Sequence, residues 1–245
     1  MNPKVKQILK ACFWSICMMA FLGLMFRTEI QRRNIVGTGV EIQFLDENEI
    51  KFLNESDISN IFDRNGLTFM NLKIDSINLT RVEEDISKNP FVRTVKAYHD
   101  LNGKVYVDLI QKEPVLRIIG DDYSYYLDEF GAKVPTSSKF TSKVMTVQGV
   151  ELNNRQDEIL LLWSKIQQNK LLKAQIVGIF VDREGEYTLN VQFGDFKVLL
   201  GGIDQLDDKF FKLEHTFRDI LNTAGWEKYS MINLKFKDQV VCTKR

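Results

Sequence analysis

The sequence predicts an α+β fold in which an N-terminal transmembrane helix precedes a β-α-α-β-β domain and a β-rich domain with helices on one side of a mainly antiparallel sheet. Three patterns support it. They are an uncharged run near the N-terminus, a series of helical and strand periodicities after it, and a later hairpin pattern with one amphipathic helix before it and one after it in the sequence. The chain has 245 residues, so the part beyond the first helix can form one or two domains with their own cores.

The predicted transmembrane helix rests on an uncharged run from Ala11 to Phe26, which Lys10 opens and Arg27 closes. At a helical rise of about 1.5 Å per residue this run nearly spans the hydrocarbon core, and the flanking basic side chains can reach the interfaces. We interpret residues 11–30 as an uncleaved anchor. A cleaved signal peptide is the alternative, but bulky and charged residues follow the run where a cleavage site needs small ones.

Charge does not decide how this helix would be inserted. Cytoplasmic flanks are recognised by an excess of lysine and arginine. Here the two flanks hold similar sets, namely Lys4, Lys6 and Lys10 before the run and Arg27, Arg32 and Arg33 after it. Both orientations stay open on charge alone.

The composition excludes several classes of partner and bond. Lysine plus arginine and aspartate plus glutamate each number 33, so the chain has no overall basic surface for nucleic acid. Of the three cysteines, Cys12 and Cys17 lie in the uncharged run, which leaves Cys242 alone outside it. No intramolecular disulfide can therefore form in the remainder of the chain.

The first domain begins with a strand and a helix. Residues 40–44 alternate between apolar and polar, as in a half-buried strand. A helix capped by Ser56 follows and ends at Gly66. Its apolar positions recur at helical spacing and are Ile58, Ile61 and Phe62.

A second helix and two strands complete the first domain. Thr80 and Glu83 stand in capping-box register at the start of the helix, and the helix must end before Pro90. Residues 91–98 and 104–111 then read as two strands joined by a short polar turn. The predicted order is β-α-α-β-β.

The second domain is predicted to contain a hairpin and two amphipathic helices. The hairpin alternates on both sides of a two-residue turn at Gly194-Asp195. The longer helix is capped by Asp204 and ended by Gly225. We expect the apolar stripes of the helices to pack on the sheet; they are Ile159, Leu162, Trp163 and Ile166, and Leu206, Phe210, Leu213, Phe217, Ile220 and Leu221.

The sequence lacks the usual constellations of catalysis and metal binding. His99 and His215 are the two histidines, and they fall in different predicted domains without other ligands at metal-binding spacing. Asp128 and Glu129 are adjacent carboxylates, but they read as part of a solvated turn before a glycine rather than as an acid–base pair. We therefore expect no enzymatic activity, no metal and no other cofactor.

Several segments carry a resemblance to a known family. They are NPFVRTVK at 89–96, VYVDL at 105–109, QKEPV at 111–115, YYLDEFGAKVP at 125–135, VLLG at 198–201, KFFKL at 209–213 and INLKF at 232–236. In this order, behind a single N-terminal anchor, they resemble the bacterial cell-division family FtsQ/DivIB, in which a POTRA domain precedes a β-rich domain.

The resemblance implies a domain organisation, a location and a function. It implies a cytoplasmic tail at residues 1–10, the transmembrane anchor at 11–30, a POTRA-like domain at 38–113 and an FtsQ-type β domain at 114–245. The chain would be a single-pass type II protein of the bacterial inner membrane, with its bulk outside the cytoplasm at the division septum. It would act as a scaffold that recruits FtsB/DivIC-like and FtsL-like membrane proteins, without nucleic acid or a small-molecule substrate.

The partner site is expected at the C-terminal edge of the second domain, because a final strand often lies at the edge of a sheet and exposes unpaired backbone groups. In the family, the corresponding strand accepts FtsB/DivIC. The candidate residues are Tyr229, Lys235, Phe236, Lys237, Gln239, Val240 and Val241, whereas Ile232 and Leu234 are expected in the core. The alternative function is a membrane-anchored envelope hydrolase or sensor that uses the β domain as a binding cleft.

Overall fold

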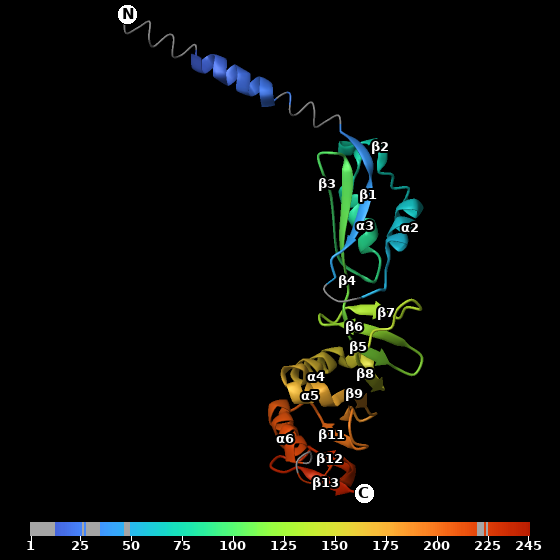
Figure 1. Ribbon diagram of the computed structural model, residues 1–245. Helices are drawn as coiled ribbons and strands as arrows, with labels where there is room; N and C mark the ends of the chain where they lie inside the picture. Colours follow the sequence, from blue (N-terminus) through green and yellow to red (C-terminus); the bar gives the residue numbers. More distant parts are fainter. Residues whose placement is uncertain (1–12, 26, 28–34, 47–49, 220–222, 224) are drawn as a thin grey trace, which may run out of the picture. The chain divides into compact units, whose positions relative to one another are not determined.

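The structure is a computed structural model that describes residues 13–25, 27, 35–46, 50–219, 223 and 225–245 (Figure 1). Residues 13–25 are helical. The described helices include none with both the length and the apolar character needed to cross a bilayer. The predicted tail at 1–10 and residues 11, 12, 26 and 28–30 of the predicted anchor lie outside the described residues.

The remainder of the chain divides into two compact units, which are described separately here. The first unit holds the residues up to 49 together with 53–111, and the second holds 50–52 and 112–245. Each unit has its own sheet. The α+β class predicted from the sequence is therefore confirmed for both.

The first unit is a four-stranded sheet with two helices. Its strands are ordered β2-β1-β4-β3, with β1 parallel to β4 and the other pairs antiparallel. The elements in chain order are β1 (Val36–Phe44), α2 (Glu55–Asn65), β2 (Met70–Lys73), a 3₁₀ turn η1 (Ile74–Ser76), α3 (Leu79–Ser87), β3 (Val92–His99) and β4 (Lys104–Gln111).

Strand β2 is absent from the predicted order because nothing in its side-chain pattern marks it. All four of its residues are exposed, and Asn71 takes a left-handed backbone conformation with φ 60°. A strand that buries no face leaves no alternation in the sequence. The predicted helices and the other strands of this unit are confirmed, with shifts of a few residues at their ends.

The predicted helix caps are wrong, although the helices are correct. Asn54 caps α2, where its side chain accepts from the Asp57 amide and the Asp57 side chain accepts from the Asn54 amide. Asn78 caps α3 by accepting from the Arg81 amide. Asparagine forms this bond as readily as serine or threonine, so the true N-cap lies two residues before each predicted one. Gly66 ends α2 in the left-handed conformation, as predicted.

The second unit is a nine-stranded sheet in the order β13-β12-β11-β10-β9-β8-β5-β6-β7. Five of its eight pairings are antiparallel and three are parallel. The elements are β5 (Pro114–Ile119), β6 (Ser124–Asp128), β7 (Lys133–Pro135), β8 (Met145–Gly149), η2 (Leu152–Arg155), α4 (Gln156–Gln168), α5 (Lys170–Gln175), β9 (Ile176–Val181), β10 (Tyr187–Val191), β11 (Lys197–Gly201), α6 (Leu206–Asp219), η4 (Trp226–Lys228), β12 (Tyr229–Asn233) and β13 (Val241–Lys244).

The helices of the second unit lie in crossovers between parallel strands. Helices α4 and α5 connect β8 to β9, and α6 connects β11 to β12. Parallel neighbours need such a connection, because a tight turn cannot return the chain to the same end of the sheet. Figure 1 shows the three helices along one side of the sheet, as expected from the sequence.

The predicted apolar stripes form the core of this unit. Ile159, Leu162 and Ile166 of α4 are fully buried, as are Leu213 and Phe217 of α6. Trp163 is only partly buried at the margin of this core. The predicted stripe residues Ile220 and Leu221 lie outside the described residues. The predicted hairpin is present as β10 and β11, but its connection runs over residues 192–196 instead of two residues.

Candidate partner-binding edge

Strand β13 forms one end of the nine-stranded sheet. It pairs antiparallel with β12, and β12 pairs parallel with β11. Within the described part of the chain β13 has a strand on one side only. The edge predicted for the INLKF segment therefore lies one strand further along the chain, because β13 covers β12.

The seven predicted partner residues fall within one short stretch around this edge. Tyr229 begins β12 opposite Lys244 of β13. Val241 begins β13 opposite Asn233. The other five occupy the connection between the two strands and are Lys235, Phe236, Lys237, Gln239 and Val240. Tyr229 and Val240 pack partly against the core, and Gln239 is exposed.

The exposure of the apolar residues separates core positions from surface positions. Ile232 and Leu234 are 0% exposed, which confirms that they belong to the core. Phe236 is 45% exposed and Val241 is 39% exposed. Large exposed apolar side chains beside an edge strand are suited to anchor a partner.

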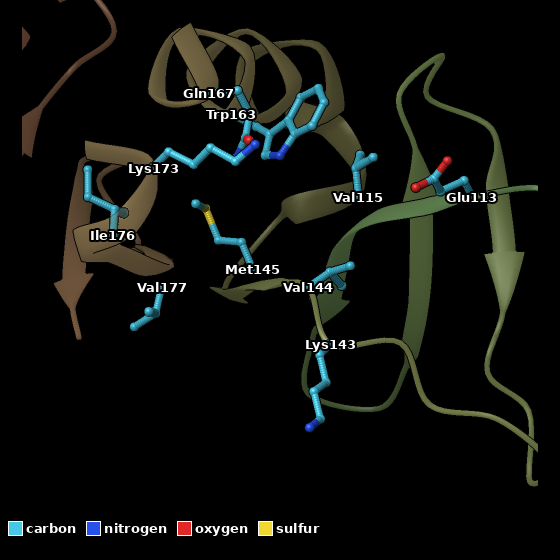
Figure 2. Close-up of a pocket in the computed structure, with 10 residues that line it drawn as sticks. All are labelled: Glu113, Val115, Lys143, Val144, Met145, Trp163, Gln167, Lys173, Ile176 and Val177. Atoms are coloured by element: carbon cyan, nitrogen blue, oxygen red, sulfur yellow. The ribbon is translucent and has the colours of Figure 1, made fainter. Parts of the chain in front are cut away.

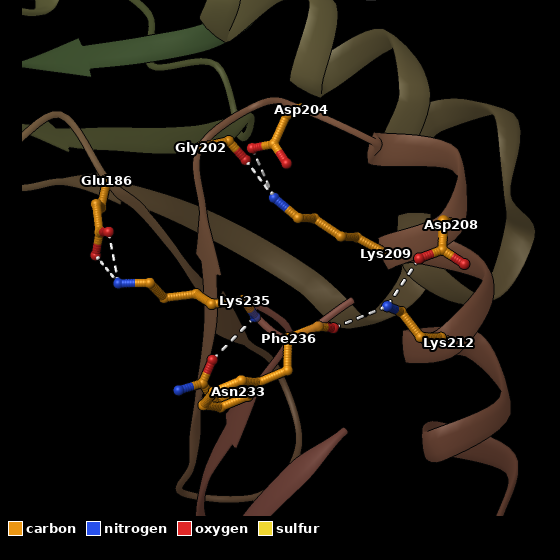
Figure 3. Close-up of polar contacts among 9 residues, drawn as sticks. All are labelled: Glu186, Gly202, Asp204, Asp208, Lys209, Lys212, Asn233, Lys235 and Phe236. Atoms are coloured by element: carbon orange, nitrogen blue, oxygen red, sulfur yellow. Dashed lines mark hydrogen bonds and ion pairs between the residues drawn. The ribbon is translucent and has the colours of Figure 1, made fainter. Parts of the chain in front are cut away.

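The connection between β12 and β13 is held against α6 by Lys212. Its ammonium donates to the backbone carbonyl of Phe236 at 3.1 Å (Figure 3). It also donates to the backbone carbonyl of Lys237 at 2.6 Å. The same ammonium pairs with Asp208 one helical turn earlier, at 2.7 Å. The Lys212 side chain is 14% exposed. Lys212 thereby positions the backbone of the exposed Phe236.

The start of the connection is held by Lys235. Its ammonium donates to the Glu186 carboxylate at 2.7 Å, and its amide donates to the Asn233 side chain at 3.0 Å (Figure 3). Its stem passes closely over Gly201, where a Cβ would lie 2.9 Å from the Lys235 Cγ. Gly201 has φ 74°, so a side chain there would be strained as well as crowded.

A small recess of about 210 Å³ beside this connection is occupied by ionic contacts rather than open to an apolar ligand. Lys209 is 5% exposed, and its ammonium donates to the Gly202 carbonyl at 2.8 Å and to Asp204 at 3.1 Å. The hydrogen bond and the positive charge of Lys209 lower the pKa of Asp204. These contacts of Lys209 therefore stabilise the start of α6.

Cys242 gives β13 a chemical probe. It lies on the edge strand and packs partly against the core. This burial raises the pKa of its thiol, which keeps the reactive thiolate scarce near neutral pH.

The described residues hold no cluster of three or more metal-ligating side chains. His99 and His215 lie in different units, and each ring faces a backbone carbonyl near it in sequence. Asp128 is 2% exposed and accepts from the amides of Phe130 and Ala132 at 3.0 and 2.8 Å. The prediction that it lies in a solvated turn is wrong, since its carboxylate is used to close the β6–β7 turn.

The sheet of the first unit also ends in an edge strand, β3. This strand pairs with β4 on one side, and helix α3 packs beside it. Glu83 of α3 accepts from the amide of Ala97 in β3 at 2.7 Å. The glutamate predicted to close the α3 capping box therefore satisfies a backbone donor of this strand instead.

The sequence indicated the exposed apolar residues of this edge but not the role of Lys212. Phe236 and Val241 were recognisable as apolar residues beyond the buried part of the last predicted strand. Nothing in the sequence indicated that Lys212 reaches the β12–β13 connection, since 24 residues separate it from Phe236. The spacing of Asp208 and Lys212 suggests only an ordinary ion pair on a helix.

Comparison with known proteins identifies both units. The model of the POTRA-like domain matches residues 35–110, which cover the sheet and helices of the first unit. The model described as FtsQ/DivIB, C-terminal related, matches residues 113–243, which run from β5 into β13 and omit only the last residue of that strand. A comparison with curated proteins found no match. Since the second match alone covers more than half of the 245 residues, the chain belongs to the FtsQ/DivIB family of non-enzymatic cell-division scaffold proteins.

Proposed function

We propose that this protein is a division-septum scaffold that recruits FtsB/DivIC-like and FtsL-like membrane proteins through the β13 edge of its second unit. Family membership supports the scaffold role. The observation that carries the site is an edge strand beside an exposed phenylalanine whose backbone is held in place by Lys212.

The proposed binding mode is the addition of a partner strand to the sheet. An unpaired strand edge offers backbone donors and acceptors at a fixed spacing, which supply affinity without depending on sequence. Phe236 and Val241 then supply specificity, since their exposed side chains can contact alternate residues of the added strand. Lys212 and Lys235 reduce the ordering cost of binding, because they fix the connection before the partner arrives.

We further propose that residues 11–30 anchor the chain in the bacterial inner membrane, with residues 1–10 in the cytoplasm and the domains at 38–113 and 114–245 outside it. The uncharged run from Ala11 to Phe26 supports the anchor. A reporter enzyme that is active only outside the cytoplasm, fused after Arg245, should be active. An inactive reporter in a correctly inserted fusion would overturn the orientation.

The partner site is tested by capture of candidate single-pass septal proteins on the full chain. Phe236→Ala should weaken capture by about thirtyfold, the scale of an aromatic hot spot worth about 2 kcal/mol. Phe130→Ala is the matched control, because Phe130 is 74% exposed in the β6–β7 turn at the other end of the sheet order. Capture should be unchanged by this control.

A second variant tests the edge itself. The Arg245 amide donates to the Lys228 carbonyl just before β12, so the amide of the preceding Lys244 points to the unpaired side of β13. Lys244→Pro removes this backbone donor. It should reduce capture while circular dichroism and melting remain near those of the wild type. If Phe236→Ala and Lys244→Pro both fold and both capture partners normally, the site lies elsewhere.

A further inference from the structure

The second unit contains an open cleft of about 570 Å³ that shares no lining residue with the β13 edge (Figure 2). A cleft of this size is within the range that binds a side chain or a small ligand. Its apolar part includes Val115 on β5, Met145 on β8, Ile176 on β9 and Trp163 on α4. Gln167, Lys173, Lys143 and Glu113 supply the polar groups.

The topology of the sheet explains why an apolar cleft exists here. Strands β5, β8 and β9 are mutually parallel, so their first residues lie at the same end of the sheet. Met145 and Ile176 each begin a strand, and Val115 is the second residue of β5. Helix α4 contributes Trp163 at this end but leaves it only partly buried. Val115 and Met145 are therefore only partly buried, whereas Ile176 is 2% exposed and forms the floor that joins the cleft to the core.

Two lysine side chains at the cleft have no ion-pair partner within the part of the chain that the structure describes, namely Lys173 and Lys143. Lys165 on α4, by contrast, pairs with Asp207 at 2.7 Å. In Figure 2, Lys173 extends toward Trp163 along the upper side of the cleft, whereas Lys143 stands at the rim and points away from it.

We propose that this cleft is a second docking site, which binds an extended peptide segment of a partner protein by a bulky apolar side chain near Trp163 and Met145 and a neighbouring carboxylate facing Lys173. Trp163 and Met145 suit such an anchor, since aromatic and thioether side chains adapt to an apolar guest. Lys173 extends toward Trp163 and has no ion-pair partner among the described residues, so the cleft favours a carboxylate at this point.

The site would give the scaffold a contact that is physically separate from strand addition. A partner held at both the cleft and the β13 edge would gain from the high effective concentration of the second contact.

The test measures binding of fluorescent ten-residue peptides to the full chain in lipid nanodiscs. One peptide carries a phenylalanine flanked by glutamates, a second replaces the glutamates by lysines, and a third replaces the phenylalanine by glycine. The first should bind saturably, and each of the other two should bind at least about tenfold more weakly. Equal binding of all three peptides would refute the proposal.

Variants locate the binding. Lys173→Glu should weaken the glutamate peptide about tenfold and strengthen the lysine peptide. Lys170→Glu is the matched control, since it makes the same charge change on α5 at an exposed residue outside the cleft. Trp163→Leu should weaken both phenylalanine peptides. Equal effects of Lys173→Glu and Lys170→Glu would refute a specific contact.

Peptide binding at the cleft should not depend on the β13 edge. Phe236→Ala should leave peptide binding at the cleft unchanged even where it abolishes capture of septal partners. Loss of peptide binding in Phe236→Ala would overturn the assignment to the cleft without bearing on strand addition.

Discussion

Replacing Lys212 by methionine should loosen the edge strand without unfolding the second unit. The change keeps most of the apolar stem but removes two hydrogen bonds, to the carbonyls of Phe236 and Lys237, and the ion pair with Asp208. Hydrogen bonds from a charged donor contribute roughly 1.5–3 kcal/mol when buried. Phe236 and Lys237 are exposed, so water can replace the donor, and we expect a loss of about 1–2 kcal/mol.

The thiol of Cys242 reports this loss directly. With Cys12 and Cys17 changed to serine, Cys242 is the remaining thiol of the chain. Its partial burial slows the reaction with a maleimide, so the rate rises when β13 opens more often. A loss of about 1–2 kcal/mol should raise the alkylation rate of Cys242 by up to about 5- to 30-fold at fixed pH.

The matched control separates the hydrogen bonds from the ion pair. Asp208→Asn removes only the partner of Lys212 within α6, which is worth about 0.3–0.5 kcal/mol. It should therefore raise the rate of Cys242 by no more than about twofold. If Lys212→Met leaves the rate unchanged, or if both variants raise it equally, Lys212 does not hold the edge strand.

Three further predictions concern folding. A fragment of residues 38–113 should melt cooperatively on its own, and a broad, featureless transition would contradict this domain boundary. Glu83→Ala leaves the Ala97 amide without its acceptor, so the free energy of hydrogen exchange at this amide should fall by about 1–2 kcal/mol. Glu83→Gln should restore most of the protection. Equal exchange in both variants would rule out this bond. The pKa of Asp204 is lowered in the folded state by Lys209, so its contribution to stability is present above the ordinary aspartate pKa and is lost as the pH falls through the folded value. Asp204→Asn should therefore flatten the acid side of the stability profile by less than about 1 kcal/mol, and an unchanged profile would show that the pair contributes nothing.

Helices with a buried stripe were predictable because burial repeats along the sequence. Ile159, Leu162 and Ile166 recur at the spacing of one helical face, and all three are 0% exposed. The N-caps were placed wrongly because several residue types compete for the same hydrogen bond, and sequence alone does not show which side chain forms it. Asn54 and Asn78 form these bonds in the structure.

The candidate site was predictable only in part. Its position near the C-terminus and its apolar residues Phe236 and Val241 followed from the family resemblance and from the strand pattern. The identity of the edge strand did not, because β13 is short, mostly exposed and without an alternating pattern. The hydrogen bonds from Lys212 to the β12–β13 connection were not predictable either, since a side chain can reach a backbone carbonyl without any sequence pattern that marks the contact.

The sequence by itself determined the order of the elements, the core stripes and the family, because each depends on local periodicity or on motifs in a fixed order. The tertiary structure alone decided which strand ends the sheet, where Lys212 and Glu83 bond, and how three parallel strand starts leave a cleft beside Trp163. These features depend on contacts between residues far apart in the chain. Strands pair through backbone groups that every residue carries, so the side-chain periodicity does not show which strands become neighbours in the sheet.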